Sequence, residues 1–263
     1  MALFNFKSLF TGEIPEMSSE LRNAMDIIHM SRYAIALTGA GISVKSGIPD
    51  FRGPQGIWKQ LDINAFFRKN IKDYEKVWSE ISKFMKTIKK ASPNDAHKSL
   101  AFLERMGYIK SIVTQNIDDL HQKAGSQNVI EFHGNFKKLK CENCNSSYNI
   151  NNTKIGKSFP PRCPNCGEIL FPEIALFGDE IKQSIIEKVT NEVNWADVLI
   201  IIGTSATVYP ASEIPQLMKE KGAYIIEINI EPTYLTDEIS DVFVRCQADI
   251  ALNKLSKGLN AIL

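Results

Sequence analysis

Short apolar runs alternate with amphipathic stretches along most of this chain. The runs that predict strands cover residues 34–37, 109–113, 129–132, 198–202 and 224–228. Residues 198–202 are apolar throughout, which is typical of a strand buried on both faces. Apolar residues at helical spacing predict helices over 19–30, 94–106, 181–193, 212–221 and 249–259. Strands that alternate with helices predict an α/β fold with a doubly wound parallel sheet.

Two segments interrupt this alternation. Residues 54–93 predict a helical insertion rich in aromatic side chains, namely Trp58, Phe66, Phe67, Tyr74, Trp78 and Phe84. Residues 137–176 are polar and rich in Asn, Pro and Cys, so we expect a small module held together by a metal rather than by a core. Together the two segments would form a small domain. The larger domain would then consist of residues 1–53, 94–136 and 177–263.

The composition adds few constraints. The chain has 263 residues, of which 44% are hydrophobic and 23% charged, and its net charge is +1. This balance fits one large domain with a small appendage, and it favours neither nucleic acid nor a membrane surface as a partner. We expect the Lys-rich stretches 83–90 and 137–140 to be solvated faces. With neither a secretion signal nor a membrane-spanning run in view, the simplest expectation is a cytoplasmic monomer.

The first predicted strand leads into a glycine-rich segment, residues 38–53. Gly39 and Gly41 allow close approach of the backbone to a phosphate, and we expect Pro49 to keep the segment a loop. The loop ends in an acid, an aromatic ring and a cation: Asp50, Phe51 and Arg52. This arrangement suits a dinucleotide with a reactive end. The third position of a G-x-G-x-x-G fingerprint is Val44, and no clear acid follows about 20 residues later, so a hydride-transfer dehydrogenase is not favoured.

Polar groups also follow the other predicted strands. They are Gln115, Asn116 and Asp118 after the second, His133 after the third, then Gly203, Thr204 and Ser205, and finally Asn229 and Glu231. The carboxyl ends of parallel strands meet at one edge of a sheet, where ligands bind in open α/β folds. Each group alone has a plainer explanation, such as a turn, a helix cap or a structural histidine. Their coincidence at strand ends favours a site. We interpret His97 and His121, within predicted helices, as structural.

Four cysteines form two C-x-x-C pairs. Cys141 and Cys144 make the first pair, Cys163 and Cys166 the second, and 18 residues separate the pairs. This spacing is typical of a zinc ribbon, and four thiolates leave no open position, so the zinc would be structural. Two disulfides are the alternative, disfavoured in a reducing compartment. The flanks lack the clustered Arg and aromatic residues of a nucleic-acid binder. We expect the fifth cysteine, Cys246, to be a small core residue.

These motifs together closely resemble those of the sirtuin family. The matching segments are 38–43, 47–53, 114–118, His133-Gly134, the four cysteines, Phe177-Gly178, Gly203-Thr204-Ser205, Tyr209-Pro210 and Asn229, all in sirtuin order over nearly the whole chain. The resemblance implies a Rossmann-like large domain and a small domain built from a zinc ribbon and a helical module. It also implies an NAD-dependent protein lysine deacylase that binds NAD and an acyl-lysine peptide between the two domains.

The resemblance also implies roles for individual residues. His133 would be the general base, and Asn116 would act beside it in catalysis. NAD would contact Gly39, Ala40, Gly41, Ile42, Ser43, Val44, Asp50, Phe51, Arg52, Gln115, Asn116, Ile117, Asp118, Gly203, Thr204, Ser205, Asn229, Ile230, Glu231 and Ala248. NAD would be consumed as a reagent, and one structural zinc would be bound by the four cysteines.

The chain departs from the family pattern at a few positions. Phe171 replaces the usual Arg, and Asp179 the usual Glu, which puts peptide-loop contacts in doubt. Ile81 and Phe84 stand where succinyl-preferring members carry a Tyr and an Arg, so we expect activity on acetyl and longer fatty acyl groups rather than on succinyl groups. The alternatives are ADP-ribosyl transfer or NAD hydrolysis at the same site, or a non-catalytic NAD-binding module.

Overall fold

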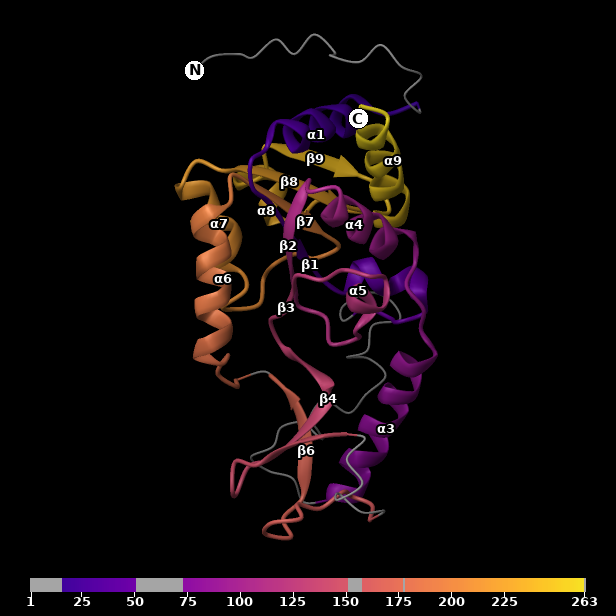
Figure 1. Ribbon diagram of the computed structural model, residues 1–263, viewed down its shortest axis with the longest axis vertical. Coiled ribbons are helices and arrows are strands. Elements are labelled where there is room, and N and C mark those ends of the chain that lie inside the picture. Colours follow the sequence, from indigo (N-terminus) through magenta and orange to yellow (C-terminus); the bar gives the residue numbers. More distant parts are fainter. Residues whose placement is uncertain (1–15, 51–72, 151–157, 177, 263) are drawn as a thin grey trace.

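A six-stranded parallel sheet forms the larger part of the molecule (Figure 1). The computed structural model describes residues 16–50, 73–150, 158–176 and 178–262. The strands are β1 (Ala34–Thr38), β2 (Ile109–Thr114), β3 (Val129–Glu131), β7 (Val198–Ile202), β8 (Tyr224–Asn229) and β9 (Val242–Arg245). Their order is β3-β2-β1-β7-β8-β9. The predicted doubly wound sheet is confirmed, and its strand order reverses between β1 and β7, where such folds bind ligands.

Helices cover both faces of this sheet. They are α1 (Ser19–Met30), α4 (Asp95–Arg105), α6 (Gln183–Trp195), α7 (Glu213–Glu220) and α9 (Ala248–Asn260), close to the predicted ranges. Side chains of β1 alternate between two hydrophobic clusters. Ala34 and Ala36 pack with α1, α4 and α9, whereas Ile35 and Leu37 pack with α6 and α7. Both faces are therefore buried, which explains why β1 and β7 contain so few polar residues.

Three elements differ from the sequence prediction. The short strand β9 and the helix α8 (Tyr234–Glu238) were not predicted, because each is too short to show a clear period. The helix α5 (Leu120–Lys123), by contrast, agrees with the helix expected around His121. The prediction that residues 38–53 form only a loop is wrong, since Ala40–Ser46 is a 3-10 helix, η1. Pro49 disfavours helical backbone at the residue before it, Ile48, so it does not prevent a helix that ends at Ser46. The helix is capped by Gly47, which adopts φ 83°.

A second, antiparallel sheet lies at the far end of the molecule (Figure 1). It consists of β4 (Gly134–Cys141), β5 (Ser147–Asn149) and β6 (Leu170–Ile174) in the order β5-β4-β6. The helix α3 (Tyr74–Lys90) packs on it through a third hydrophobic cluster, in which Trp78 meets Leu139 and Leu170. The predicted helix in the 54–93 insertion is thus confirmed for its second half. Trp58, Phe66 and Phe67 lie outside the described residues.

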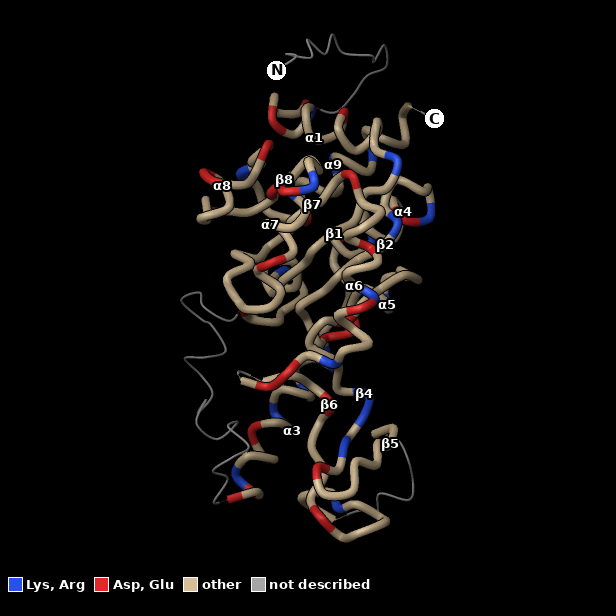
Figure 2. Tube along the Cα trace, turned by 90° about the vertical axis from the view of Figure 1, so that its left-hand side faces the viewer, with Lys and Arg blue, Asp and Glu red and all other residues tan. Residues whose placement is uncertain are grey.

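Charged residues of both signs are interspersed over the described trace, apart from a basic run on β4 (Figure 2). Lys137 and Lys138 of that run are exposed, as expected of a solvated face. Within the described ranges, no helix combines the length and the apolar character needed to cross a bilayer.

Candidate functional site

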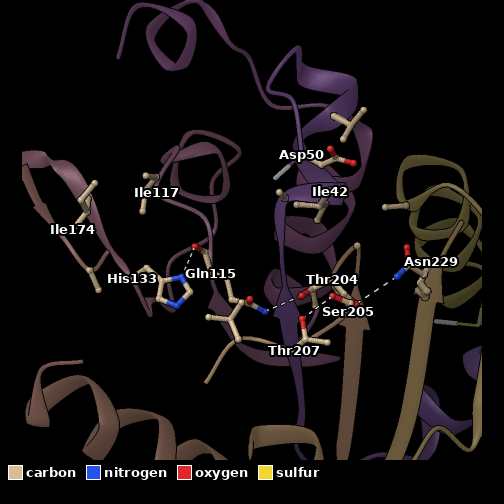
Figure 3. A pocket seen from close by; sticks show the side chains of 18 of the residues that line it. Ile42, Asp50, Gln115, Ile117, His133, Ile174, Thr204, Ser205, Thr207 and Asn229 are labelled. Atoms are coloured by element: carbon tan, nitrogen blue, oxygen red, sulfur yellow. Dashed lines mark hydrogen bonds between the residues drawn. The ribbon is translucent and has the colours of Figure 1, made fainter. Parts of the chain in front are cut away.

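A cavity of about 530 Å³ lies at the carboxyl edge of the large sheet (Figure 3). Most of the predicted site residues line it: Ala40, Gly41, Ile42, Val44, Asp50, Gln115, Ile117, His133, Gly203, Thr204, Ser205, Asn229, Ile230 and Ala248. They come from the ends of the six strands or from segments that follow them. The wall thus combines backbone, hydroxyl and amide groups with apolar side chains, as small-molecule sites commonly do.

Other predicted residues do not line the cavity. Gly39, Ser43, Asn116 and Asp118 are buried outside the lining. Glu231 is exposed, and its carboxylate pairs with the Arg245 guanidinium at 2.7 Å. Phe51 and Arg52 lie outside the described residues.

Ser43, Asn116 and Asp118 form one buried hydrogen-bonded network. The Asn116 amide donates to the carbonyl of Gly39 at 3.1 Å and to the Ser43 hydroxyl at 3.2 Å. The Ser43 hydroxyl donates to the Asp118 carboxylate at 2.7 Å. Burial raises the pKa of Asp118. The buried Asn116 Oδ1 has no hydrogen-bond partner among the described residues, and such an atom is normally satisfied by a ligand or water. The network therefore fixes the Asn116 amide group while one of its polar atoms stays available.

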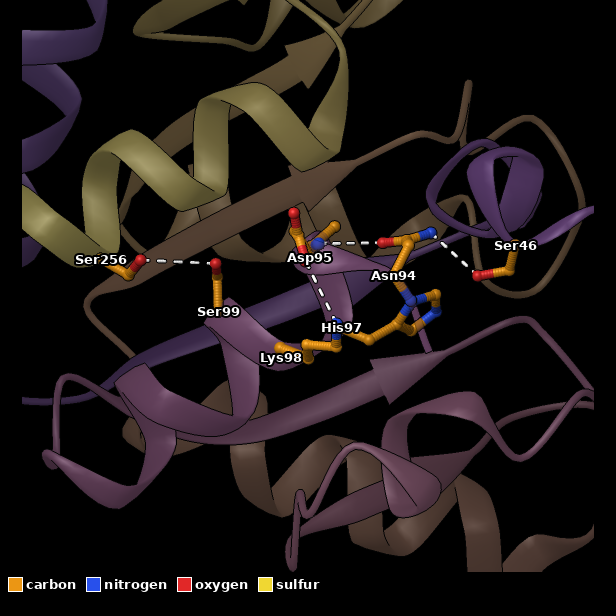
Figure 4. Close-up of polar contacts among 8 residues, drawn as sticks. Ser46, Asn94, Asp95, His97, Lys98, Ser99 and Ser256 are labelled. Atoms are coloured by element: carbon orange, nitrogen blue, oxygen red, sulfur yellow. Dashed lines mark hydrogen bonds and ion pairs between the residues drawn. The ribbon is translucent and has the colours of Figure 1, made fainter. Parts of the chain in front are cut away.

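The start of α4 holds η1 in place. Asn94, the N-cap of α4, donates through its side chain to the carbonyl of Ile42 at 2.8 Å and to the Ser46 hydroxyl at 3.0 Å (Figure 4). The His97 ring accepts the backbone N–H of Asn94 at 3.4 Å. His97 is fully buried, and burial lowers its pKa to about 4. Its contacts agree with the structural role expected for it.

His133 carries an ordered imidazole at the cavity wall (Figure 3). Its Nδ1 lies 2.9 Å from the backbone carbonyl of Gln115. Because a carbonyl can only accept, Nδ1 carries the proton and Nε2 keeps its lone pair. Burial lowers the pKa of His133, which favours the neutral ring near neutral pH. The Gln115 side chain donates to the Thr204 hydroxyl at 3.0 Å, so the histidine is connected to the far wall of the cavity.

The glycine-rich turn packs directly on the end of β7. The backbone N–H of Gly41 donates to the carbonyl of Gly203 at 2.9 Å. A Cβ on Gly41 would lie 2.7 Å from the Cα of Gly203. The sequence pattern predicts that this glycine allows close approach to a phosphate. The close packing of two protein segments is a second reason for it, which the sequence did not reveal.

Other residues line the cavity that were not among the predicted site residues, although Phe84, Gly178, Asp179 and Tyr209 were named through the family resemblance. These other residues are Lys45, Phe84, Phe136, Ile174, Ala175, Leu176, Gly178, Asp179, Ile181, Thr207, Val208, Tyr209, Ile228, Cys246, Gln247 and Asp249. Cys246 packs against the first hydrophobic cluster, as expected, but also borders the cavity. Tyr209 is 74% exposed at the cavity, and its place in a family motif was the only sequence signal for it. Most of the others follow strands by a few residues, where spacing gives no signal.

The four cysteines of the two C-x-x-C pairs form one cluster. Their sulfur atoms all lie within 4.8 Å of one another, and the cysteines are not joined by disulfides. The Cys141 and Cys166 sulfurs are 3.5 Å apart, and those of Cys144 and Cys163 are 3.6 Å apart. Four sulfurs about 2.3 Å from a tetrahedral zinc would be about 3.8 Å from one another. The cluster therefore fits a zinc ion with no open position, and the disulfide alternative is not realised.

Comparisons with known proteins agree with this geometry. The model of the Sir2 family matches residues 39–210. An NAD-dependent protein deacetylase of Saccharolobus solfataricus is 48% identical over 87% of this chain and 93% of its own length. An NAD-dependent protein deacylase of Thermococcus kodakarensis is 40% identical over 92% of this chain and 97% of its own length. A Sir2 homologue in complex with NAD is 38% identical, with a TM-score of 0.83 over 95% of this chain and 96% of that one.

Proposed function

This chain belongs to the Sir2 family, and we propose that it removes acetyl and longer fatty acyl groups from protein lysines in a reaction that consumes NAD. The products are free lysine, nicotinamide and O-acyl-ADP-ribose. The observation that carries the proposal is the cavity in which the family's motif residues meet His133, beside the Asn116 amide held by Gly39 and Ser43. A solved Sir2 structure with a p53 peptide and NAD supports a peptide substrate.

NAD fits the residues that are present at this edge of the sheet. When bound, it supplies an electrophilic ribose carbon, C1′, and nicotinamide as the leaving group. We propose that η1 and Asp50 hold its pyrophosphate and nicotinamide ribose, with Asn116, Ile117 and Asp118 next to the nicotinamide. Thr204, Ser205, Asn229, Ile230 and Ala248 would contact the adenosine side. Gln115 and Gly203 would form the wall between these parts, and the buried Gly39 would hold the Asn116 amide through its carbonyl. The proposed roles of Phe51, Arg52 and Glu231 follow from the family resemblance alone.

His133 is proposed as the general base. Its Nδ1–H is committed to the Gln115 carbonyl, so Nε2 is the nitrogen that can take a proton from a ribose hydroxyl. The lowered pKa keeps Nε2 unprotonated near neutral pH. The Asn116 side chain, fixed by Gly39 and Ser43, would orient the reacting groups without exchanging a proton.

The zinc is structural in this proposal. Four thiolates complete its coordination, so no position remains for substrate or water. Two of its ligands, Cys141 and Cys163, are buried in the third hydrophobic cluster. We propose that the acyl-lysine peptide pairs as an extended strand near β6 and residues 174–176, 178 and 179, which border the cavity.

The acyl end of the cavity is proposed to be apolar. Phe84 and Phe136 contact each other with ring centroids 5.7 Å apart, and both line the cavity with Ile117 and Ile174. Ile81, at the position of the acyl-binding Tyr in succinyl-preferring relatives, is buried in the third cluster. A carboxylate in such surroundings would lose hydration without gaining a partner. We therefore propose acetyl and fatty acyl groups as substrates and disfavour succinyl.

The test is mass spectrometry of an acetyl-lysine peptide with and without NAD. We expect loss of the acetyl group only with NAD, appearance of O-acetyl-ADP-ribose, and loss of both in His133→Ala. A matched variant, His29→Ala, changes a histidine on α1 that does not line the cavity and should retain activity. Consumption of NAD with an unchanged peptide would instead indicate hydrolysis or ADP-ribosyl transfer. An unchanged peptide with intact NAD would indicate a binding module.

A further inference from the structure

The turn that carries His133 is enclosed by two polar side chains, Glu131 before it and Asn135 after it. The Asn135 amide donates to Glu131 Oε2 at 2.5 Å, which closes the turn through side chains. The Asn135 side-chain oxygen accepts the backbone N–H of Lys137 at 2.8 Å, which fixes the amide itself. Hydrogen bonds to a charged acceptor are shorter and stronger than neutral ones. The Glu131 carboxylate therefore stabilises the conformation of residues 131–135.

The same carboxylate reaches a second segment of the site. Gln122 of α5 donates to Glu131 Oε1 at 3.0 Å. The helix α5 directly follows the segment that contains Asn116 and Asp118, and the backbone N–H of Leu120 donates to the Asp118 carboxylate at 2.9 Å. Each oxygen of Glu131 thus binds a different segment, one that leads to His133 and one that leads to Asn116.

The backbone around His133 leaves little other freedom. The carbonyl of His133 accepts the N–H of Ala175 at 2.9 Å, which joins the turn to the segment after β6. Gly134 has φ 79°, and a Cβ there would lie 2.2 Å from the carbonyl oxygen of Glu173. Neither contact fixes the turn relative to α5. Two described side-chain contacts join those segments: the Glu131–Gln122 hydrogen bond, and the ion pair between Lys137 and Asp119, the N-cap of α5.

We propose that Glu131 is a positioning residue for this reaction, which sets the imidazole of His133 relative to the Asn116 segment through Asn135 and Gln122. Glu131 does not line the cavity, so it acts through these neighbours and not on the substrate. The inference rests on the proposed deacylase function. A small misplacement of a catalytic group can lower the rate about a hundredfold without loss of binding, so the effect should fall on kcat.

The variant Glu131→Gln keeps the size of the side chain but removes its charge and one acceptor oxygen. We expect kcat on an acetyl-lysine peptide to fall about tenfold or more, with KM for NAD close to that of the wild type. Gln122→Ala and Asn135→Ala each remove one donor and keep the carboxylate, and each should lower kcat in the same way. These two variants also test the proposal if the Glu131→Gln protein does not fold.

Glu104→Gln is the matched control. The Glu104 carboxylate accepts the backbone N–H groups of Gln127 and Asn128, at 3.1 Å and 2.6 Å, at the opposite end of β3. This variant should lower stability with little change in kcat. Equal kcat losses in Glu104→Gln and Glu131→Gln would overturn the proposal, because they would indicate a general structural effect. Wild-type kcat in all three variants around Glu131 would also overturn it.

A second readout does not depend on activity. The chain contains only four histidines, so NMR can follow the titration of His133, assigned by its loss in His133→Ala. We expect the pKa of His133 to rise toward the ordinary value in Glu131→Gln, because a looser turn admits water to the ring. If Glu131→Gln changes neither the pKa of His133 nor kcat, the positioning role of Glu131 is excluded. Wild-type protein that does not deacylate would instead contradict the proposed function, and the NMR shift would then test the Glu131 contacts alone.

Discussion

Gly41 and Gly203 pack backbone against backbone, so neither can carry a side chain. A Cβ on Gly41 would lie 2.7 Å from the Cα of Gly203, and a Cβ on Gly203 would lie 2.8 Å from the carbonyl carbon of Gly41. Gly203 also has φ 59°, a conformation that other residues rarely adopt. The position of η1, and with it one wall of the cavity, is therefore set by the end of β7.

Gly41→Ala should separate these two segments. We expect the free energy of unfolding to fall by about 1–3 kcal/mol, as for other overpacked sites, and the affinity for NAD to fall with it. Thermal unfolding and calorimetric titration with NAD would measure the two effects. Gly222→Ala is the control, because Gly222 has φ 81° in an open turn between α7 and β8. That variant should lose stability and keep its NAD affinity. A Gly41→Ala protein with normal NAD affinity would contradict the argument.

Much of the fold could be predicted from the sequence, because the central strands are apolar on both faces. Residues 198–202 match β7, and residues 19–30 match α1. The short edge strand β9 could not be predicted, since four residues at the edge of a sheet show no clear period. The 3-10 helix η1 was missed because its stability comes from Asn94 and Gly203, which are distant in sequence.

Acyl selectivity should follow the apolar lining near Phe84. On one peptide, we expect acetyl and myristoyl lysine to react faster than succinyl lysine. Lys45, on η1, is the one cation among the described residues that line the cavity, whereas the wall near α3 is formed by aromatic and aliphatic groups. Phe84→Ala should lower kcat/KM for the myristoyl substrate more than for the acetyl one, through lost apolar contact. Steady-state rates on the acetyl, myristoyl and succinyl peptides measure this selectivity. A rate that is highest on the succinyl peptide would contradict the apolar acyl site.

Stability should decrease as the solution becomes acidic. Burial lowers the pKa of His97 to about 4 and also lowers the pKa of His121. The unfolded chain therefore binds protons that the folded chain does not, and the free energy of unfolding falls as the pH drops below about 6.5. Each such histidine adds a slope of up to about 1.4 kcal/mol per pH unit.

His97→Gln should flatten this pH dependence. Urea unfolding of the variant and the wild type, between about pH 7 and about pH 4.5, gives the two slopes. The raised pKa of Asp118 has the opposite sign, because its folded form holds a proton more readily, so the comparison with the variant isolates His97. Identical slopes would show that His97 does not titrate as its burial implies.

Zinc retention should depend on Tyr148. Its hydroxyl lies 3.3 Å from the Cys163 sulfur, a position from which it can donate to a zinc-bound thiolate. Tyr148→Phe should weaken zinc binding about tenfold, measured by transfer of zinc to a chromogenic chelator. Tyr224→Phe, at an exposed tyrosine of β8, is the control. Equal rates of zinc transfer to the chelator in both variants would exclude a role for the Tyr148 hydroxyl in zinc binding.

The cavity was predictable where site residues directly follow strands. Gln115, His133 and Thr204 all line it, as the strand-end argument required. Spacing could not show that Ser43 turns inward to bind Asp118 instead of facing the cavity. Nor could it explain Phe171, which replaces the usual Arg of the family. In the structure, Phe171 is buried, and its ring stacks on Trp78 with centroids 6.5 Å apart.

The small sheet and α3 are excursions of the chain between elements of the large sheet. One runs from η1 to α4 and the other from β3 to α6, and neither contributes a strand to the six-stranded sheet. Such excursions can change in length or sequence during evolution while the strand order stays the same. One contact limits how far the two excursions can change. Ile48 and Leu120 are buried in the third hydrophobic cluster, and they lie next to the segments proposed to bind NAD, residues 40–46 and 115–118 (the cofactor segments). A replacement module must therefore supply apolar partners for these two side chains, or the cofactor segments lose their support.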